Sequence, residues 1–362
     1  MLLKTNRDKK FINLAINLAK DRIGLTGTNP SVGCVIVKNN RIISIGQTGF
    51  GGTPHAEVNA INNASETVKD STLYVSLEPC SHYGKTKPCT NKIIKSKIKK
   101  VVYSVDDIDT RSSGKSYSIL KKKKIKCVKH ILNKRGSELY KSYFHLKTRD
   151  FPYVTGKIAC TKNYLFKNNS KYISNNHSIN FSHFLRYINH AILISYKTAN
   201  TDNPKLNCRL NGLEKYSPIR IIIDKNLKIK ENLYLVKSSK KVKTYIFYNK
   251  KNYKYNRLKA KGIKLIYCPI DENNNLDLIF IMKKIKSLKI NYLLVEGGKF
   301  LTKEFLNHRL FNCFYLFKSN KISSFKKKYK ILNIIKLIKK NFSKSNKVNT
   351  YLENDIILRH YN

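Results

Sequence analysis

Short apolar runs that predict strands alternate with segments of helical apolar spacing through the first 105 residues. Asn29 and Pro30 interrupt the chain after the first helical segment, and Asn39 and Asn40 form a turn signal that predicts a hairpin. Strands that alternate with helices indicate an α/β domain of packed layers. The predicted helices are residues 9–20, 54–64 and 89–96, and the predicted strands are residues 32–37, 41–46, 71–77 and 99–105.

The second half of the chain shows the same two kinds of pattern, which predicts a second α/β domain. A highly charged stretch over residues 106–150 separates the halves, and we place the domains at residues 1–148 and 149–362. The Lys-, Ile- and Asn-rich segment 318–347 predicts no particular element. The predicted strands of this half are residues 153–159, 190–195, 220–224, 242–248, 263–267 and 291–295.

The composition is that of an ordinary globular protein, since 41% of the 362 residues are hydrophobic. No apolar run approaches the ~18 residues of a membrane-spanning helix. The start of the chain is too polar for a signal peptide, so we expect a cytoplasmic protein. Eight cysteines are scattered along the chain, which argues against a disulfide framework and leaves metal binding or burial.

The charge is extreme, because 72 Lys and Arg residues stand against 22 Asp and Glu residues and give a net charge of +50. Such a charge is compatible with a nucleic-acid-binding protein. It also follows from a composition rich in Lys, Asn, Ile and Tyr, and the basic residues are spread along the whole chain. We favour the second interpretation and expect small-molecule partners, no specific nucleic acid and no membrane, and we leave a homo-oligomer open.

Three short motifs in the first half together indicate a zinc site. His55 and Glu57 stand two residues apart at the start of a predicted helix. Cys80 ends a predicted strand, and Cys89 opens the next predicted helix, where the helix dipole favours a thiolate. One imidazole and two thiolates can hold a catalytic zinc and leave its fourth position for water. Glu57, which is not a ligand, then carries the proton from water to a leaving amine, as in zinc deaminases.

Two other interpretations of these residues are open. A single His or Cys is most often an ordinary surface or core residue. This interpretation explains poorly why His55, Cys80 and Cys89 occur together in this order. A purely structural zinc has four protein ligands, and His82 is the candidate for the fourth. We expect a zinc-dependent hydrolytic deaminase, with His55, Cys80 and Cys89 as ligands and Glu57 as acid and base.

Three segments of the first half form a longer pattern: NPSVGCVIV at residues 29–37, PHAE at 54–57 and LEPCSHYGKTKPC at 77–89. Together they resemble the bifunctional riboflavin-biosynthesis deaminase/reductase family, RibD. The long loop between the two cysteines separates this family from nucleoside and transfer-RNA deaminases. The resemblance implies a cytidine-deaminase-like three-layer α/β/α domain with one zinc ion. It also implies that Asn29, His82 and Lys85 help to hold the substrate.

The second half resembles the reductase domain of the same family, which is similar to dihydrofolate reductase in fold and uses NADPH. The glycines at 297 and 298 follow a predicted strand and precede a helix, where the backbone and the helix dipole suit a pyrophosphate. The implied substrate-binding residues are Ser170, Leu206, Arg209 and Glu296. The implied NADPH-binding residues are Cys160, Tyr172, Thr198, Asp202, Lys225, Gly298, Lys299, Phe300, Leu301, Thr302, Lys303 and Glu304.

The resemblance implies two successive reactions on a pyrimidine ribosyl phosphate. The first is hydrolytic deamination of 2,5-diamino-6-(5-phosphoribosylamino)pyrimidin-4-one to 5-amino-6-(5-phosphoribosylamino)uracil. The second is NADPH-dependent reduction of the ribosyl group to a ribityl group. The chain is therefore expected to be both an aminohydrolase and an oxidoreductase.

The second half departs from the family pattern at two places. Thr-Lys-Asn-Tyr replaces Ser-Leu-Asp-Gly at residues 161–164, and Lys-rich sequence replaces a Pro- and Gly-rich ending after Phe317. These departures leave open a deaminase with a decayed reductase domain. The net charge of +50 leaves open a second alternative, a zinc-stabilised RNA-binding or RNA-deaminating protein.

Overall fold

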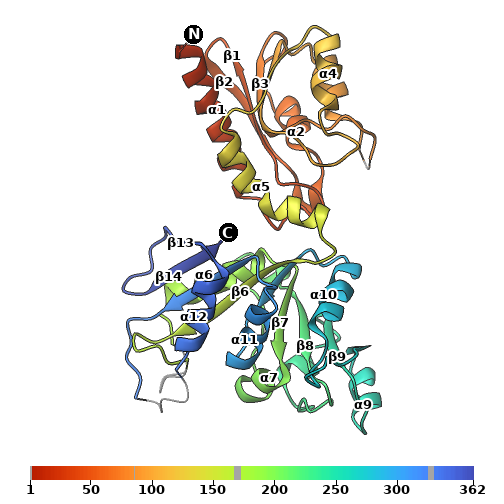
Figure 1. Cartoon of the computed structure of the whole chain (residues 1–362). Helices are drawn as coiled ribbons and strands as arrows, with labels where there is room; N and C mark the ends of the chain where they lie inside the picture. The colour runs from red at the N-terminus through yellow and green to blue at the C-terminus, as the bar shows by residue number, and fades with distance from the viewer. Residues whose placement is uncertain (1, 85, 167–172, 325–329) are drawn as a thin grey trace. The chain divides into compact units, whose positions relative to one another are not determined.

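The computed structural model describes residues 2–84, 86–166, 173–324 and 330–362. The chain forms two compact units, Met1–Arg149 and Asp150–Asn362, each with its own sheet (Figure 1). The predictions for Lys85, Ser170 and Tyr172 lie outside the described residues.

The first unit contains a five-stranded mixed sheet with the strand order β2-β1-β3-β4-β5. The strands β1 and β2 form the expected antiparallel hairpin, β3 pairs antiparallel with β1, and the last three strands are parallel to one another. The strands are β1 (Gly33–Lys38), β2 (Arg41–Gln47), β3 (Thr72–Leu77), β4 (Lys100–Val105) and β5 (Lys126–Val128).

Helices cover both faces of this sheet, because successive residues of its strands are apolar on both sides. Val35 and Val37 pack against Ile12 of α1, whereas Cys34 and Ile36 belong to the cluster that contains Ala60 of α2. The result is a three-layer α/β/α unit (Figure 1). One face carries α1 (Leu2–Lys20) and α5 (Asn133–Thr148), and the other carries α2 (Ala56–Asn62), α3 (Cys89–Lys95) and α4 (Lys115–Lys122).

The second unit contains a nine-stranded sheet with the order β10-β9-β8-β7-β11-β6-β12-β14-β13. The first seven strands in this order are parallel, and β14 pairs antiparallel with both β12 and β13. The strands are β6 (Tyr153–Cys160), β7 (Ala191–Ser195), β8 (Ile219–Ile223), β9 (Thr244–Tyr248), β10 (Lys264–Tyr267), β11 (Tyr292–Val295), β12 (Cys313–Lys318), β13 (Lys344–Lys347) and β14 (Ile356–Tyr361).

Two apolar cores lie on the two faces of this sheet. Leu193 of β7 packs into one core, and its neighbours Ile192 and Ile194 pack into the other, as expected of a strand buried on both sides. The first core contains α10 (Leu278–Ser287), α11 (Lys299–Asn307) and α12 (Leu332–Asn341). The second contains α6 (Asn176–Tyr187), α7 (Tyr196–Asp202), α8 (Tyr234–Lys237) and α9 (Tyr255–Ala260).

The structure corrects the sequence-based expectation in two regions. The charged stretch 106–150 contains α4, β5 and α5, which bury Leu120, Tyr140 and Tyr143 while their charged residues face solvent. The segment 318–347 is not featureless, because it contains α12 and β13. Ile334 and Ile338 of α12 are four residues apart and fully buried, which is the helical spacing that the surrounding lysines obscured.

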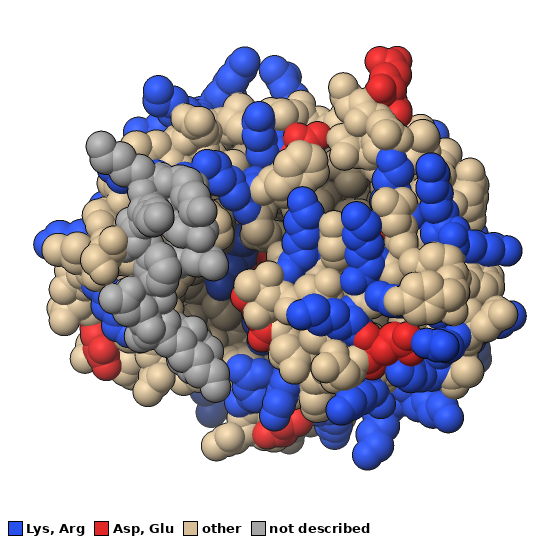
Figure 2. Space-filling model, turned by 90° about the horizontal axis from the view of Figure 1, so that it is seen from below, with Lys and Arg blue, Asp and Glu red and all other residues tan. Residues whose placement is uncertain are grey.

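Basic side chains are spread over the face of the molecule shown in Figure 2 and do not gather into one stripe. This distribution agrees with a compositional origin of the charge and gives no sign of a track for nucleic acid on that face. Among the described residues, no helix has the length and apolarity that crossing a membrane requires.

Candidate functional site

Three predicted metal ligands meet in the first unit. His55 is the N-cap of α2, Cys80 follows β3 by three residues, and Cys89 is the first residue of α3. The His55 Nδ1 atom lies 3.3 Å from the Cys89 Sγ atom and 3.4 Å from the Cys80 Sγ atom, and the ligand atoms all lie within 4.8 Å of one another. Tetrahedral zinc with ordinary Zn–N and Zn–S lengths needs an N–S separation of about 3.6 Å. These residues therefore fit a zinc ion.

The site favours thiolate before any metal binds. Hydrogen bonding with the Cys89 side chain, then with His55 and the Cys89 backbone N–H, lowers the pKa of Cys80 to about 4. The adjacent Cys80 thiolate raises the pKa of Cys89, and burial adds to this effect. The hydrogen bond with Cys80 also raises the pKa of His55. Binding of a divalent cation would release the proton left on this cluster.

Glu57 lies beside the ligands in the first turn of α2, and only 3% of its surface is exposed. Burial, reinforced by the Cys80 thiolate, raises the pKa of Glu57 to about 7. A carboxyl group that titrates near neutrality can both accept and donate a proton, which is the property required of an acid/base residue.

Two structural features hold these elements in place. A side chain at Gly46 of β2 would collide with the backbone of Ala56 and Ala60, so the glycine allows α2 to lie directly on the strand. The buried carboxylate of Glu78 accepts hydrogen bonds from four donors: Asp107 N at 3.1 Å, Gly114 N at 3.0 Å, Ser116 N at 3.2 Å and Ser116 Oγ at 2.7 Å. Glu78 thus ties the end of β3, which leads to Cys80, to the 107–116 loop.

Two of the metal ligands, His55 and Cys80, line a cavity of about 190 Å³ together with Glu57, and the predicted residues Asn29 and His82 line it as well. The Asn29 Nδ2 atom donates to the Gly52 carbonyl at 2.8 Å, an approach that needs a glycine because Gly52 has φ +100° and no room for a Cβ beside Thr26. The His82 Nδ1 atom lies 2.7 Å from the Ser112 Oγ atom. Among the described residues, His82 is not part of the metal-binding group, which argues against a four-ligand structural site.

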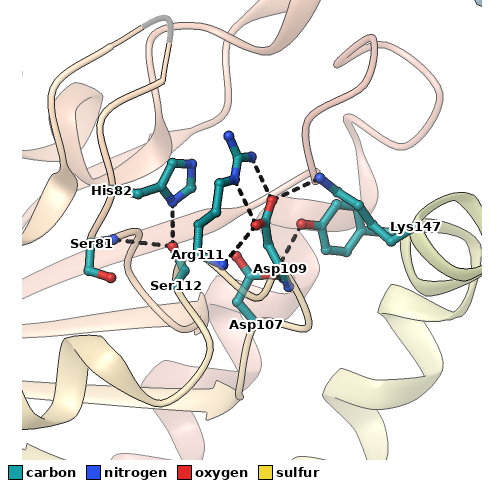
Figure 3. A network of polar contacts seen from close by, with 8 residues as sticks. Ser81, His82, Asp107, Asp109, Arg111, Ser112 and Lys147 are labelled. Atoms are coloured by element: carbon teal, nitrogen blue, oxygen red, sulfur yellow. Dashed lines mark hydrogen bonds and ion pairs between the residues drawn. The ribbon is translucent and has the colours of Figure 1, made fainter.

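A polar network that the sequence did not reveal lies along one side of this cavity (Figure 3). Tyr143 Oη donates to Asp107 at 3.0 Å. Arg111 donates through Nε and Nη2 to both oxygens of Asp109, at 2.9 and 2.7 Å, and Lys147 Nζ donates to Asp109 at 2.9 Å. The hydrogen bonds from Arg111, and then those from Lys147, hold the pKa of Asp109 far below its usual range. Residues 107–111 are therefore fastened to the last turns of α5.

A larger cavity of about 650 Å³ lies in the second unit. The cavity is lined by residues at the carboxyl ends of β6, β7, β8 and β11. In the sheet, β11 lies between β7 and β6, although both of these strands come earlier in the chain. Ligands of open α/β sheets bind at such a place. Gly298 is the N-cap of α11 at this edge, so the helix N-terminus opens onto the cavity.

Most of the predicted reductase residues line this cavity, but several do not. Those that line it are Thr198, Asp202, Lys225, Glu296, Gly298, Lys299, Phe300, Leu301 and Glu304. Cys160, Leu206 and Thr302 are instead buried in the structure, and Arg209 and Lys303 are exposed to solvent away from the cavity lining. The roles of this second group stay predictions.

Two cations that no sequence motif indicated accompany Glu296. Arg186 of α6 donates through Nε and Nη2 to both carboxylate oxygens of Glu296, at 3.0 and 2.9 Å. Burial alone would raise the pKa of Glu296, but Arg186 and then Lys157 outweigh it and lower the pKa to about 2. Lys157 lies in β6 and lines the cavity. A lysine inside an otherwise apolar strand was the available signal for Lys157, whereas Arg186 has no local motif.

Replacing Arg186 with Met should lower the free energy of unfolding of the second unit by about 3 kcal/mol, because the buried Glu296 carboxylate loses its partner. Arg209→Met, at an exposed position, serves as the control and should change it by less than about 0.5 kcal/mol. Urea denaturation measures both. A small loss for Arg186→Met, equal to that of the control, would contradict the pairing.

The contribution of the Arg186–Glu296 pair to stability should depend on pH in the acid range. The folded pKa of Glu296, about 2, lies below that of an unpaired glutamate, about 4.3. The pair therefore contributes stability that is fully present above pH ~4.3 and is lost as the pH falls toward 2. Arg186→Met should lack most of this acid dependence.

The Tyr164 backbone shows how the chain accommodates one departure from the family pattern. Tyr164 occupies the place where the family has glycine and adopts a left-handed φ of +64°, a conformation that costs free energy for a residue with a side chain. Its hydroxyl accepts a hydrogen bond from Lys318 Nζ at 3.0 Å. The turn after β6 is thus kept without its glycine.

Comparisons with known proteins agree with both sites. Residues 5–105 match the family model of the cytidine and deoxycytidylate deaminase zinc-binding region, and residues 165–322 match that of the RibD C-terminal domain. The chain is 36% identical to riboflavin biosynthesis protein RibD of Aquifex aeolicus (strain VF5), over 87% of each protein. It is 28% identical to RibD of Escherichia coli (strain K12), over 81% of this chain and 82% of that protein.

A solved structure agrees over the whole length. The crystal structure of a diaminohydroxyphosphoribosylaminopyrimidine deaminase/5-amino-6-(5-phosphoribosylamino)uracil reductase from Thermotoga maritima matches 99% of each chain, with a TM-score of 0.80 and 27% identity. The expected fold class is therefore confirmed, with a cytidine-deaminase-like domain followed by a reductase domain. This chain belongs to the RibD family of bifunctional riboflavin-biosynthesis enzymes, which join a zinc-binding deaminase domain to an NADPH-dependent reductase domain.

Proposed function

We propose that this chain deaminates 2,5-diamino-6-(5-phosphoribosylamino)pyrimidin-4-one and then reduces the ribosyl group of the product, 5-amino-6-(5-phosphoribosylamino)uracil, with NADPH. The observation that carries the proposal is the meeting of His55, Cys80 and Cys89 beside a cavity that the buried Glu57 lines. We assign the deaminase to residues 1–148 and the reductase to residues 149–362.

In the deaminase domain, His55, Cys80 and Cys89 would hold the zinc ion. Zinc, when bound, activates water for attack on the carbon that carries the amino group. Glu57 accepts a proton from this water and delivers it to the departing amine, so that ammonia leaves. Asn29 and His82, which line the cavity, would hold the pyrimidine.

In the reductase domain, the cavity of about 650 Å³ lies within the range of roughly 300–1,000 Å³ that is typical of small-molecule and cofactor sites. Thr198, Gly298 and the first turn of α11 would bind the cofactor, whose chemistry is hydride transfer. Glu296, with Arg186 and Lys157, would face the ribosyl group. The two cations that accompany Glu296, Arg186 and Lys157, support a retained reductase site.

The test is incubation of the zinc-loaded full chain with the diamino-pyrimidinone substrate, with and without NADPH. Ammonia release and NADPH oxidation are followed separately. We expect ammonia in both mixtures and NADPH oxidation only after deamination has begun. Ammonia without NADPH oxidation would instead support a decayed reductase, and the absence of both signals would overturn the proposal.

A location in the cytoplasm, an action on small molecules alone and assembly into a homo-oligomer stay predictions. Size-exclusion chromatography with light scattering addresses the oligomer. Binding to duplex or single-stranded RNA that falls steeply with salt would argue for the nucleic-acid alternative.

A further inference from the structure

The deaminase cavity is smaller than the substrate that it must serve. Its volume of about 190 Å³ lies below the range of roughly 300–1,000 Å³ that encloses a whole drug-sized ligand. A pyrimidine ring whose amino-bearing carbon reaches the metal ligands would fill the interior. The ribosyl phosphate of the same molecule must then lie at the edge of the cavity.

Charge is distributed unevenly along the cavity lining. The groups around the metal ligands are acidic: Glu57, Glu78 and Asp107 are all buried. Among the described residues of the lining, Arg111 and Lys147 are the only Lys or Arg side chains, and they stand together on either side of Asp109 (Figure 3). A phosphate dianion is therefore repelled from the interior and attracted to this edge.

Arg111 and Lys147 keep donors available for such an anion. Arg111 uses Nε and one Nη2 hydrogen for Asp109, and no other described residue forms a hydrogen bond with its Nη1. Lys147 uses one donor of its ammonium group for Asp109. Their side chains are 57% and 34% exposed, so an incoming anion can reach them. The three groups carry a net charge of +1, and Asp109 holds both cations in one orientation.

We infer that Arg111 and Lys147 bind the phosphate of the deaminase substrate, with Asp109 as the residue that positions them. This inference rests on the proposed function, because the substrate must carry a phosphate. It also gives a role to the hydrogen bond between α5 and the 107–111 loop. Lys147 lies in the last turn of α5, and its hydrogen bond with Asp109 keeps its side chain at the cavity. The pair thereby selects phosphorylated over unphosphorylated pyrimidine ribosides.

The test compares ammonia release from the diamino-pyrimidinone ribosyl phosphate and from the same compound after removal of its phosphate. The zinc-loaded full chain, Arg111→Gln, Lys147→Gln and the double variant are assayed. Lys141→Gln is the matched control, because Lys141 also lies on α5, has a side chain that is 41% exposed, pairs with Glu138 and does not line the cavity. Inorganic phosphate is titrated into each reaction as a competing anion.

Each single variant should raise KM for the phosphorylated substrate about tenfold, the effect of one lost charge-assisted hydrogen bond. The KM for the unphosphorylated compound should stay unchanged, and inhibition by inorganic phosphate should weaken. Lys141→Gln should match the unmodified chain.

Three results would overturn the inference. One is equal use of both substrates by the unmodified chain. Another is a KM for the variants that equals that of Lys141→Gln. The last is an equal rise of KM for both substrates, which indicates a general loss of structure. If the unmodified chain releases no ammonia from either compound, the proposed function itself fails, a result that is distinct from these three.

Discussion

Replacing Glu57 with Gln should lower kcat for ammonia release by roughly 10³-fold while zinc stays bound at one ion per chain. The amide keeps the volume and a hydrogen-bonding oxygen, but it cannot accept the proton of the attacking water or deliver it to the departing amine. Zinc should stay because Glu57 is not among the three side chains that meet at the metal site. Ammonia release measures the first effect, and elemental analysis measures the second.

Glu66→Gln is the matched control for this variant. Glu66 lies in the same unit, is exposed, forms a surface ion pair with Lys38 and does not line the cavity. Its kcat should equal that of the unmodified chain. If Glu57→Gln lost its zinc, Glu57 would have to be reconsidered as a ligand, and if it kept full activity, another residue would have to move the proton.

Replacing Cys80 with Ser should remove zinc and destabilise the first unit. A hydroxyl is a poor zinc ligand. Of the two cysteines, Cys80 is the one whose pKa the site lowers, so it is the more readily ionised thiol. A metal that binds only the folded unit stabilises it by about 4 kcal/mol at a thousand times its dissociation constant, and this contribution would be lost. We therefore expect a lower melting temperature that no longer responds to added zinc or chelator.

Cys127→Ser separates this effect from the general cost of removing a sulfur. Cys127 lies in β5 of the same unit, is partly buried and takes no part in the metal cluster. Its zinc content should be unchanged, and its melting temperature should still fall when a chelator is added. Retention of full zinc occupancy by Cys80→Ser would remove Cys80 from the ligand set.

Both predictions concern residues that sequence patterns alone could identify. His55, Glu57, Cys80 and Cys89 each lie at the junction of a strand or turn with a helix, and those junctions follow from local spacing of apolar residues and from Pro and Gly. The central strands of both sheets were equally readable, because strands buried on both faces are continuous apolar runs. The zinc and NADPH expected from the motifs are confirmed at the level of the family.

Other functional groups were hidden because their role depends on partners distant in sequence. Arg186 and Glu296 are 110 residues apart, and Lys147 and Asp109 are 38 apart. An arginine or lysine on a helix surface has the same local pattern whether it faces solvent or a buried carboxylate. Helices α4, α5 and α12 were missed for a related reason, since dense lysines masked the few apolar positions that anchor them.

The sequence by itself indicated the strands and helices of residues 9–105 and most strands of the second sheet, and it predicted the zinc ligands and the proton carrier, because each depends on short-range patterns. Only the tertiary structure decided which charged side chains pair with each other beside the two cavities. Packing of α5 and α6 against their sheets brings Lys147 to Asp109 and Arg186 to Glu296. Burial then sets the strength of these pairs, and no local pattern encodes burial of that kind.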